Sequence, residues 1–130
     1  MAEIQAKLQS LSEEFQKLQS ELQTVISSRQ KLEAQKTENT GVKGEFEKLK
    51  EGEDIYKLVG PVLLKQDKVE AEATVSGRLE FIGKEIERQE SQIREIQEKI
   101  ERIKGEIIKI QTSAQAQAAA PAGDAGAVAA

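Results

Sequence analysis

The sequence predicts a mainly α protein, in which a long antiparallel two-helix coiled coil is joined by a β-hairpin. Three observations lead to this fold class. Of the 130 residues, 32% are charged and only 3% are aromatic, which is typical of long helices that bury a narrow stripe. Two segments carry apolar residues at alternating spacings of three and four. A short segment rich in apolar and β-branched residues lies between them and suits strands.

The first helical segment is expected over residues 1–51. Arg29 is the one charged residue in its heptad stripe. Gly41 and Gly44 follow where the stripe weakens, so a bent or loosened helix is expected there. Gly52 is a candidate C-terminal cap. The stripe consists of Ile4, Leu8, Leu11, Phe15, Leu18, Leu22, Val25, Arg29 and Leu32.

The β-hairpin is expected over residues 52–67, with strands at about 54–59 and 61–66. Gly60 and Pro61 interrupt the apolar run and predict the turn. A lone two-stranded hairpin is marginal in water, and both of its edges would be unpaired. We therefore expect it to join hairpins of other chains into a larger sheet or a closed barrel. Packing on its own helix ends, or pairing in a simple homodimer, is the alternative.

The second helical segment is expected over residues 68–112, with Asp67 at its start. A narrow stripe needs a partner helix. Reversal at the hairpin would bring together residues whose numbers sum to about 118–120. Leu8 would then lie near Ile110, and Arg29 near Gln89, forming a polar layer that fixes the register. The stripe consists of Val75, Leu79, Ile82, Ile86, Gln89, Ile93, Ile96, Ile100, Ile103, Ile107 and Ile110.

The remaining Ala-rich segment, 113–130, contains Pro121 and has no apolar face, so we expect a disordered tail. The sequence has no His and no Cys, which removes imidazole and thiol chemistry. Together with the lack of a glycine-rich phosphate loop, this indicates a protein that is not an enzyme and uses no metal or other cofactor. No basic block suits nucleic acid or a membrane surface, and no signal peptide or membrane span is visible. A cytoplasmic location is expected.

Three motifs resemble those of β-type prefoldin subunits, over roughly residues 3–112. The hairpin motif is KLVGPVLLKQ at residues 57–66. The first-helix motif is RQKLEAQ at 29–35, followed by Glu38 and Asn39. The second-helix motif is RLEFI at 78–82 together with ERQESQ at 87–92. Gly41, Gly44 and the Ala-rich tail depart from the family pattern.

The resemblance implies a subunit of a heterohexameric, ATP-independent co-chaperone. In that family two α-type and four β-type subunits assemble through their hairpins into a β-barrel platform. Their coiled coils capture unfolded proteins such as actin and tubulin and deliver them to the cytosolic group II chaperonin. The residues alone leave open a structural coiled-coil scaffold or dimerisation protein without client binding, which would differ in its mass in solution.

Two sets of residues are candidates for these roles. The far ends of the coiled coil are candidates for client binding, and Ile108 differs from the rest because it lies off the stripe. Most of the others are stripe positions, for which a coiled-coil core is the alternative role. The subunit-assembly candidates are Ile55, Tyr56, Leu58, Val59, Gly60, Pro61, Val62, Leu63 and Leu64. The client-binding candidates are Ile4, Leu8, Leu11, Ile103, Ile107, Ile108 and Ile110.

Overall fold

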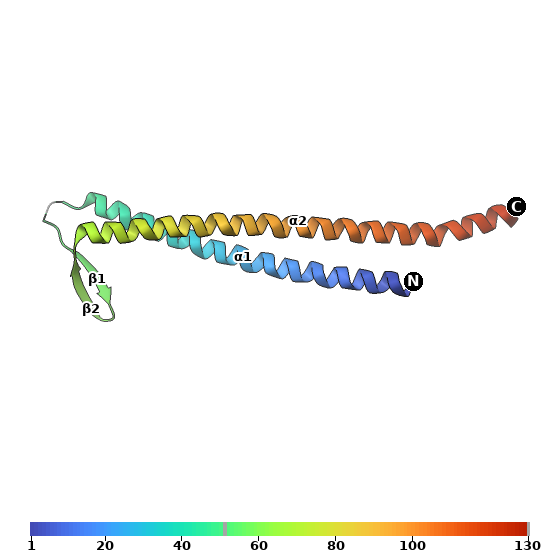
Figure 1. Cartoon of the computed structure of the whole chain (residues 1–130), viewed down its shortest axis with the longest axis horizontal. Coiled ribbons are helices and arrows are strands. Elements are labelled where there is room, and N and C mark those ends of the chain that lie inside the picture. Colours follow the sequence, from blue (N-terminus) through green and yellow to red (C-terminus); the bar gives the residue numbers. More distant parts are fainter. Residues whose placement is uncertain (51, 130) are drawn as a thin grey trace. The chain divides into compact units, whose positions relative to one another are not determined.

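The computed structural model describes residues 1–50 and 52–129, with side chains described up to residue 118. Two long helices flank a two-stranded hairpin, in the order α1 (Ala2–Lys48), β1 (Ile55–Val59), β2 (Val62–Gln66) and α2 (Lys68–Ala129) (Figure 1). This arrangement confirms the predicted combination of long helices and a hairpin. The chain divides into two compact units, which are described separately: Met1–Val25 with Gln92–Ala130, and Ile26–Ser91.

The first unit is held together by a cluster of apolar side chains from α1 and α2. Leu11 and Leu18 of α1 are buried with Ile100 and Ile103 of α2. Low-numbered residues thus meet high-numbered ones, as antiparallel pairing requires. All members of the cluster are predicted stripe positions, so the heptad pattern identified this core. Five half-buried side chains pack against it: Phe15, Leu22, Ile96, Ile107 and Ile110.

The second unit contains the hairpin and the parts of α1 and α2 next to it. Its buried side chains lie on one face of α2 at heptad spacing, and all but one belong to the predicted stripe. Ala71 extends that stripe by one step toward the helix start. The buried residues are Ala71, Val75, Ile82, Ile86 and Gln89.

A polar layer links α1 and α2 within the second unit, but its partners differ from those predicted. Arg29 does not meet Gln89. Its guanidinium Nη2 lies 2.8 Å from Oε1 of Glu90, while Nε2 of Gln89 donates to Oγ of Ser28 at 2.7 Å. The numbers of these pairs sum to 119 (29 with 90) and 117 (28 with 89), close to the predicted register. Reversal at the hairpin thus predicted the register closely, but the hydrogen-bond partners of Arg29 and Gln89 are Glu90 and Ser28 instead of each other.

The first helix continues through Gly41 and Gly44 and ends at Lys48, slightly before the expected residue 51. Beyond it, the amide of Glu53 donates to the carbonyl of Lys50 at 3.1 Å. Gly52 has φ 90° within that turn. Because Gly52 lies four residues past the last helical residue, it supports the turn and does not cap the helix.

The hairpin strands are paired antiparallel, with Val59 opposite Val62 and Leu58 opposite Leu63. Gly60 has φ 58° and precedes Pro61. Positive φ at the first central position followed by the fixed φ of proline is the arrangement of a type II′ turn, whose twist matches that of the strands. Each strand is one residue shorter than expected, since pairing begins at Ile55 and resumes at Val62.

The second helix begins at Lys68, and the amide of Ala71 donates to the carbonyl of Asp67 at 2.9 Å. Asp67 therefore occupies the N-cap position, as predicted. The backbone of α2 remains helical to Ala129, whereas a disordered tail was expected from residue 113. Alanine has the highest helix propensity, and extending an existing helix needs no new nucleus. The side chains of residues 119–130 lie outside the described part of the chain.

Candidate functional site

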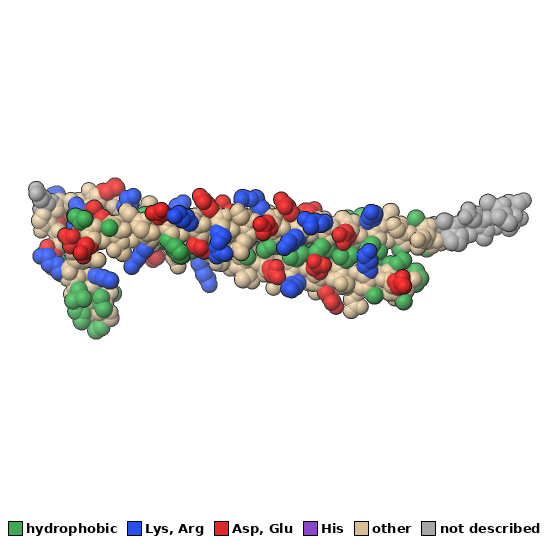
Figure 2. Space-filling model, viewed as in Figure 1, with side chains coloured by type: hydrophobic (Ala, Val, Ile, Leu, Met, Phe, Trp, Pro, Cys, Tyr) green, Lys and Arg blue, Asp and Glu red, His purple; other side chains and the backbone are tan. Residues whose placement is uncertain are grey.

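The hairpin carries an exposed apolar surface, called here the hairpin surface. Leu58 is 68% exposed and Leu63, opposite it, is 63% exposed. The space-filling view shows apolar side chains, in green, gathered on the hairpin (Figure 2). Only Ile55 among the apolar strand residues is half-buried. The hairpin surface consists of Ile55, Tyr56, Leu58, Val59, Val62, Leu63 and Leu64.

Both faces of the hairpin contribute to this surface. Opposed residues in an antiparallel pair point to the same face, and neighbours along a strand alternate. Leu58 and Leu63 therefore share one face, while Val59 and Val62 share the other. Among the described residues each strand is paired only with the other, so their outer edges carry free backbone donors and acceptors. Both faces and both edges can thus accept further protein.

The predicted client-binding residues do not form one exposed surface. Leu11 and Ile103 are buried in the cluster of the first unit, where Ile107 and Ile110 pack against them. Ile108 is 62% exposed and is the only one of the seven on the open surface. Leu11 and Ile103 therefore have the alternative role that was considered for stripe positions, that of a coiled-coil core. Ile108, which lies off the stripe, is exposed instead.

Ile4 and Ile110 line one groove in the first unit, with a volume of about 490 Å³. Glu3 and Lys7 of α1 and Glu106 and Lys109 of α2 surround these two apolar side chains. Leu8, also predicted here, is half-buried. The lining of the groove thus combines apolar side chains with charges of both signs.

The shifted titrating groups lie on the helix surface and outside both candidate surfaces. A side-chain hydrogen bond from Arg88, with Nη2 at 2.8 Å from Oε2, holds the pKa of Glu85 below its usual value. A hydrogen bond to Glu90 likewise raises the pKa of Arg29. These shifts are the consequence of surface ion pairs.

The described residues include neither a metal-binding cluster nor a membrane-spanning helix. No group of three or more acidic, His or Cys side chains is arranged to hold a metal ion in that part of the chain. No helix there is long and apolar enough to cross a membrane. The hairpin surface and the groove in the first unit are two candidate interaction surfaces in the described part of the chain.

The comparison with known families decides the class of protein. The family model described as prefoldin subunit matches residues 9–114. This chain belongs to the prefoldin subunit family. As a prefoldin subunit it is part of a chaperone complex formed with other prefoldin subunits.

Curated relatives and solved structures agree with this assignment. Prefoldin subunit 6 of Bos taurus is 47% identical over 124 residues, covering 95% of this chain and 96% of the relative. Prefoldin subunit 6 of Saccharomyces cerevisiae is 45% identical over 107 residues, covering 82% and 94%. The crystal structure of the prefoldin beta subunit from Thermococcus strain KS-1 superposes with a TM-score of 0.72 at 26% identity, covering 78% of this chain and 89% of that one.

One exposed feature of this prefoldin subunit was not expected from the sequence. Val69 and Phe81 of α2 are large apolar residues that stand out into solvent. Phe81 was noted only as part of a family motif. Its position off the heptad stripe, which singled out Ile108, would have marked it as well.

Proposed function

We propose that this chain is a β-type subunit of a heterohexameric, ATP-independent chaperone that captures unfolded proteins such as actin and tubulin. In this proposal the complex delivers them to the cytosolic group II chaperonin, and the chain works in the cytoplasm. The observation that carries the proposal is the hairpin surface, which is apolar on both faces and open at both edges. Joining hairpins of other subunits into a β-barrel would bury the faces and pair the edges.

Client capture is assigned to the first unit. Ile108 lies on the open surface, and Ile4 and Ile110 line the nearby groove with charged neighbours. Unfolded chains expose apolar side chains, which such a surface would shield from aggregation. Fraying at helix ends would expose further stripe residues to a client.

Assembly is tested by native mass spectrometry after co-expression with candidate α-type and β-type prefoldin subunits. We expect a hexamer that contains this chain. A structural scaffold or dimerisation protein without client binding, the second candidate, would instead give a homodimer of this chain alone. That result would refute the proposed assembly.

Client capture is tested with the Ile107→Ser/Ile108→Ser variant. It should suppress aggregation of chemically unfolded actin less well than the wild type, while the hexamer forms normally, because the change removes apolar surface away from the hairpin. The single Ile108→Ser variant avoids any loss of core packing, since Ile107 is half-buried and Ile108 is not.

Val42→Ser, a similar change at an exposed position of the second unit, is the matched control and should leave suppression unchanged. Wild-type suppression by both Ile108 variants would contradict the assignment of client capture to this surface.

A further inference from the structure

A row of apolar and small residues runs along the exposed side of α2 in the second unit. Val69 is 72% exposed and Phe81 is 64% exposed, and Ala73 and Gly77 between them are exposed as well. The four residues follow one another at intervals of four, so they form one ridge of the kind that interdigitates when helices pack. None of them belongs to the heptad stripe that faces α1. This row is called here the Phe81 ridge.

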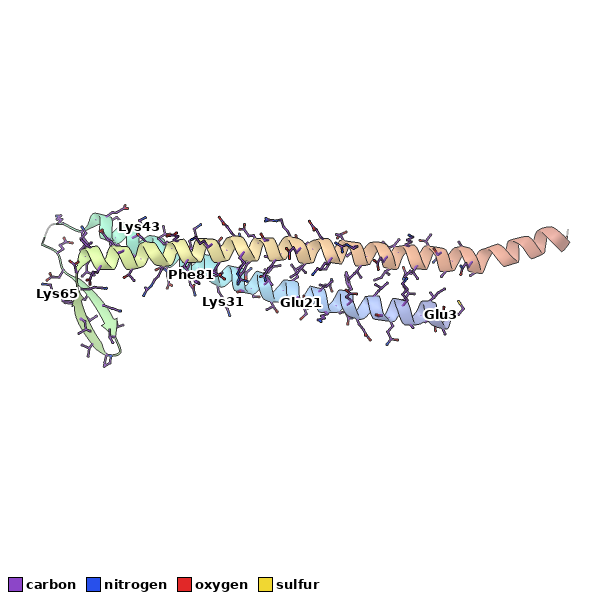
Figure 3. The ribbon with its side chains drawn as sticks, viewed as in Figure 1. Glu3, Glu21, Lys31, Lys43, Lys65 and Phe81 are labelled. Carbon is purple, nitrogen blue, oxygen red and sulfur yellow. The ribbon has the colours of Figure 1, made fainter. Side chains whose placement is uncertain are left out.

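The ridge borders a hollow. A groove of about 440 Å³ is lined by Gly77, Phe81 and Ile82 of α2 and by Gln35 and Asn39 of α1. A Cβ atom placed on Gly77 would meet nothing within 4 Å, so the glycine leaves space that no side chain of this chain fills. Figure 3 labels Phe81 on the part of α2 that follows the hairpin.

Folding of the chain on its own does not account for these residues. A glycine inside a helix costs about 1 kcal/mol relative to alanine, and no packing within this chain requires Gly77. Single exposed apolar residues are common on protein surfaces. An aromatic ring beside an open groove, in a row that reaches the hairpin, is a larger feature of the kind that marks contact sites.

The position and charge of the ridge indicate its occupant. Val69 is the second residue of α2 and follows the last residue of β2, Gln66, by three positions, so the ridge begins next to the base of the hairpin. Arg78 also lines the groove and has no ion-pair partner among the described residues, whereas Glu80 next to Phe81 is paired with Lys84 at 3.3 Å. The Phe81 end of the ridge therefore presents apolar surface with an uncompensated positive charge.

We infer that the Phe81 ridge is a second assembly surface, which packs against a helix of a neighbouring prefoldin subunit. The partner helix presents an apolar face bordered by an acidic side chain that meets Arg78. The absence of a side chain at Gly77 lets that helix approach closely, because helices packed through such ridges lie about 8–10 Å apart. This inference rests on the proposed function, since it requires that the hairpins bring neighbouring subunits together.

The burial of Phe81 can be observed directly with the Phe81→Trp variant. The chain has no tryptophan, so the new residue reports on position 81 alone once the emission of the wild-type complex is subtracted. On co-assembly with the partner subunits, its emission should shift to shorter wavelength and become less accessible to acrylamide. Ile108→Trp, at an equally exposed position of the same helix, is the matched control and should not shift.

The outcomes separate this inference from the proposed function. A complex that forms while Trp emission at position 81 stays unchanged overturns the inference and leaves the proposed function intact. Absence of any complex with wild-type chain overturns both. A shift that arises in the chain alone would assign the ridge to a second copy, and a shift that requires unfolded actin would assign it to a client. Either of these results overturns the inference.

The contribution to assembly is measured with Phe81→Ser. Loss of the buried ring should raise the concentration at which half of the complex dissociates by about tenfold, which corresponds to ~1.4 kcal/mol. Arg78→Glu should also weaken the complex, because it reverses the charge facing the acidic partner. Ile108→Ser is the matched control and should leave the half-dissociation concentration unchanged. Unchanged dissociation of both the Phe81→Ser and the Arg78→Glu complexes would contradict the inference.

Discussion

Gln89 is the one polar residue buried in the coiled-coil seam of the described chain. Its side chain is 7% exposed, and Nε2 donates to Ser28, but Oε1 has no hydrogen-bond donor among the described residues. A buried acceptor left without a partner costs about 1–3 kcal/mol. Because the neighbouring Arg29–Glu90 pair is partly exposed to solvent, it offsets little of this cost. Gln89 therefore favours a defined register over maximum stability.

An apolar residue in place of Gln89 should stabilise the coiled coil. Gln89→Leu should raise the free energy of unfolding by roughly 1 kcal/mol, because it removes the unsatisfied acceptor and adds apolar contact in the seam. Urea unfolding followed by circular dichroism measures the change. Gln97→Leu, the same substitution at an exposed position of α2, should have little effect. A less stable Gln89→Leu variant would mean that the hydrogen bond to Ser28 stabilises the fold by more than the unpaired Oε1 atom destabilises it.

The Glu85–Arg88 pair predicts a dependence of stability on pH. Since the hydrogen bond from Arg88 lowers the pKa of Glu85 in the folded state, its contribution is present above the unfolded pKa of about 4.3. It is lost as the pH falls through the lower folded pKa. The wild type should therefore lose more stability between pH 7 and pH 3 than Glu85→Gln, as measured by urea unfolding at each pH. Glu47→Gln is the control and should lose as much stability as the wild type. Equal losses of stability in Glu85→Gln and the wild type would contradict the lowered pKa of Glu85.

At the scale of elements, the sequence determined which faces pair but not every contact. Alternating spacings of three and four identified the core of the first unit, because burial of a helix stripe depends on periodicity alone. The same pattern could not predict that Arg29 binds Glu90 and not the adjacent Gln89. The choice between two neighbouring partners depends on side-chain length and rotamer. The first helix ends at Lys48 and not at residue 51, and the second continues to Ala129 and does not end at residue 112. Where a helix ends depends on the helical residues before it as well as on the propensity of each residue.

The glycines allow a prediction for the hairpin. Gly60 has φ 58°, a conformation that costs an L-residue about 1–2 kcal/mol. Gly60→Ala should therefore speed hydrogen exchange of the strand amides by about 5- to 30-fold. Gly44→Ala, in the ordinary helical backbone of α1 with open space at its Cβ, should stabilise by about 1 kcal/mol instead. Equal exchange rates in Gly60→Ala and wild-type hairpins would contradict the argument.

At the scale of the whole molecule, two kinds of apolar surface have separate places in the chain. The core of the first unit closes within this chain, whereas the hairpin surface remains open. The sequence predicted this division, because a heptad stripe finds its partner in the other arm and an apolar hairpin has none. It could not give the groove beside Gly77, which follows from how α1 and α2 pack in the second unit.

This separation predicts that assembly can be lost without loss of the coiled coil. The Leu58→Ser/Leu63→Ser variant should keep the helical circular dichroism of the wild type, because both leucines are exposed and neither is a buried core residue. It should fail to enter the complex with co-expressed prefoldin subunits in native mass spectrometry, since one face of the hairpin becomes polar. Val42→Ser serves as the control for loss of an exposed apolar side chain. Normal incorporation of the hairpin variant would show that the unpaired strand edges are enough for assembly without this apolar face.

The two connections of the hairpin to the helices differ in length. Asp67 alone joins β2 to α2, whereas residues 49–54 join α1 to β1. A connection of one residue restricts the direction of a helix relative to the strand before it, whereas a longer connection allows the two elements to rotate relative to each other. Any sheet that β2 enters would therefore set the direction in which the start of α2 leaves the hairpin, and the part of α1 that contacts α2 within the second unit would follow. Within that unit, the hairpin thus orients α2 directly and α1 only through α2.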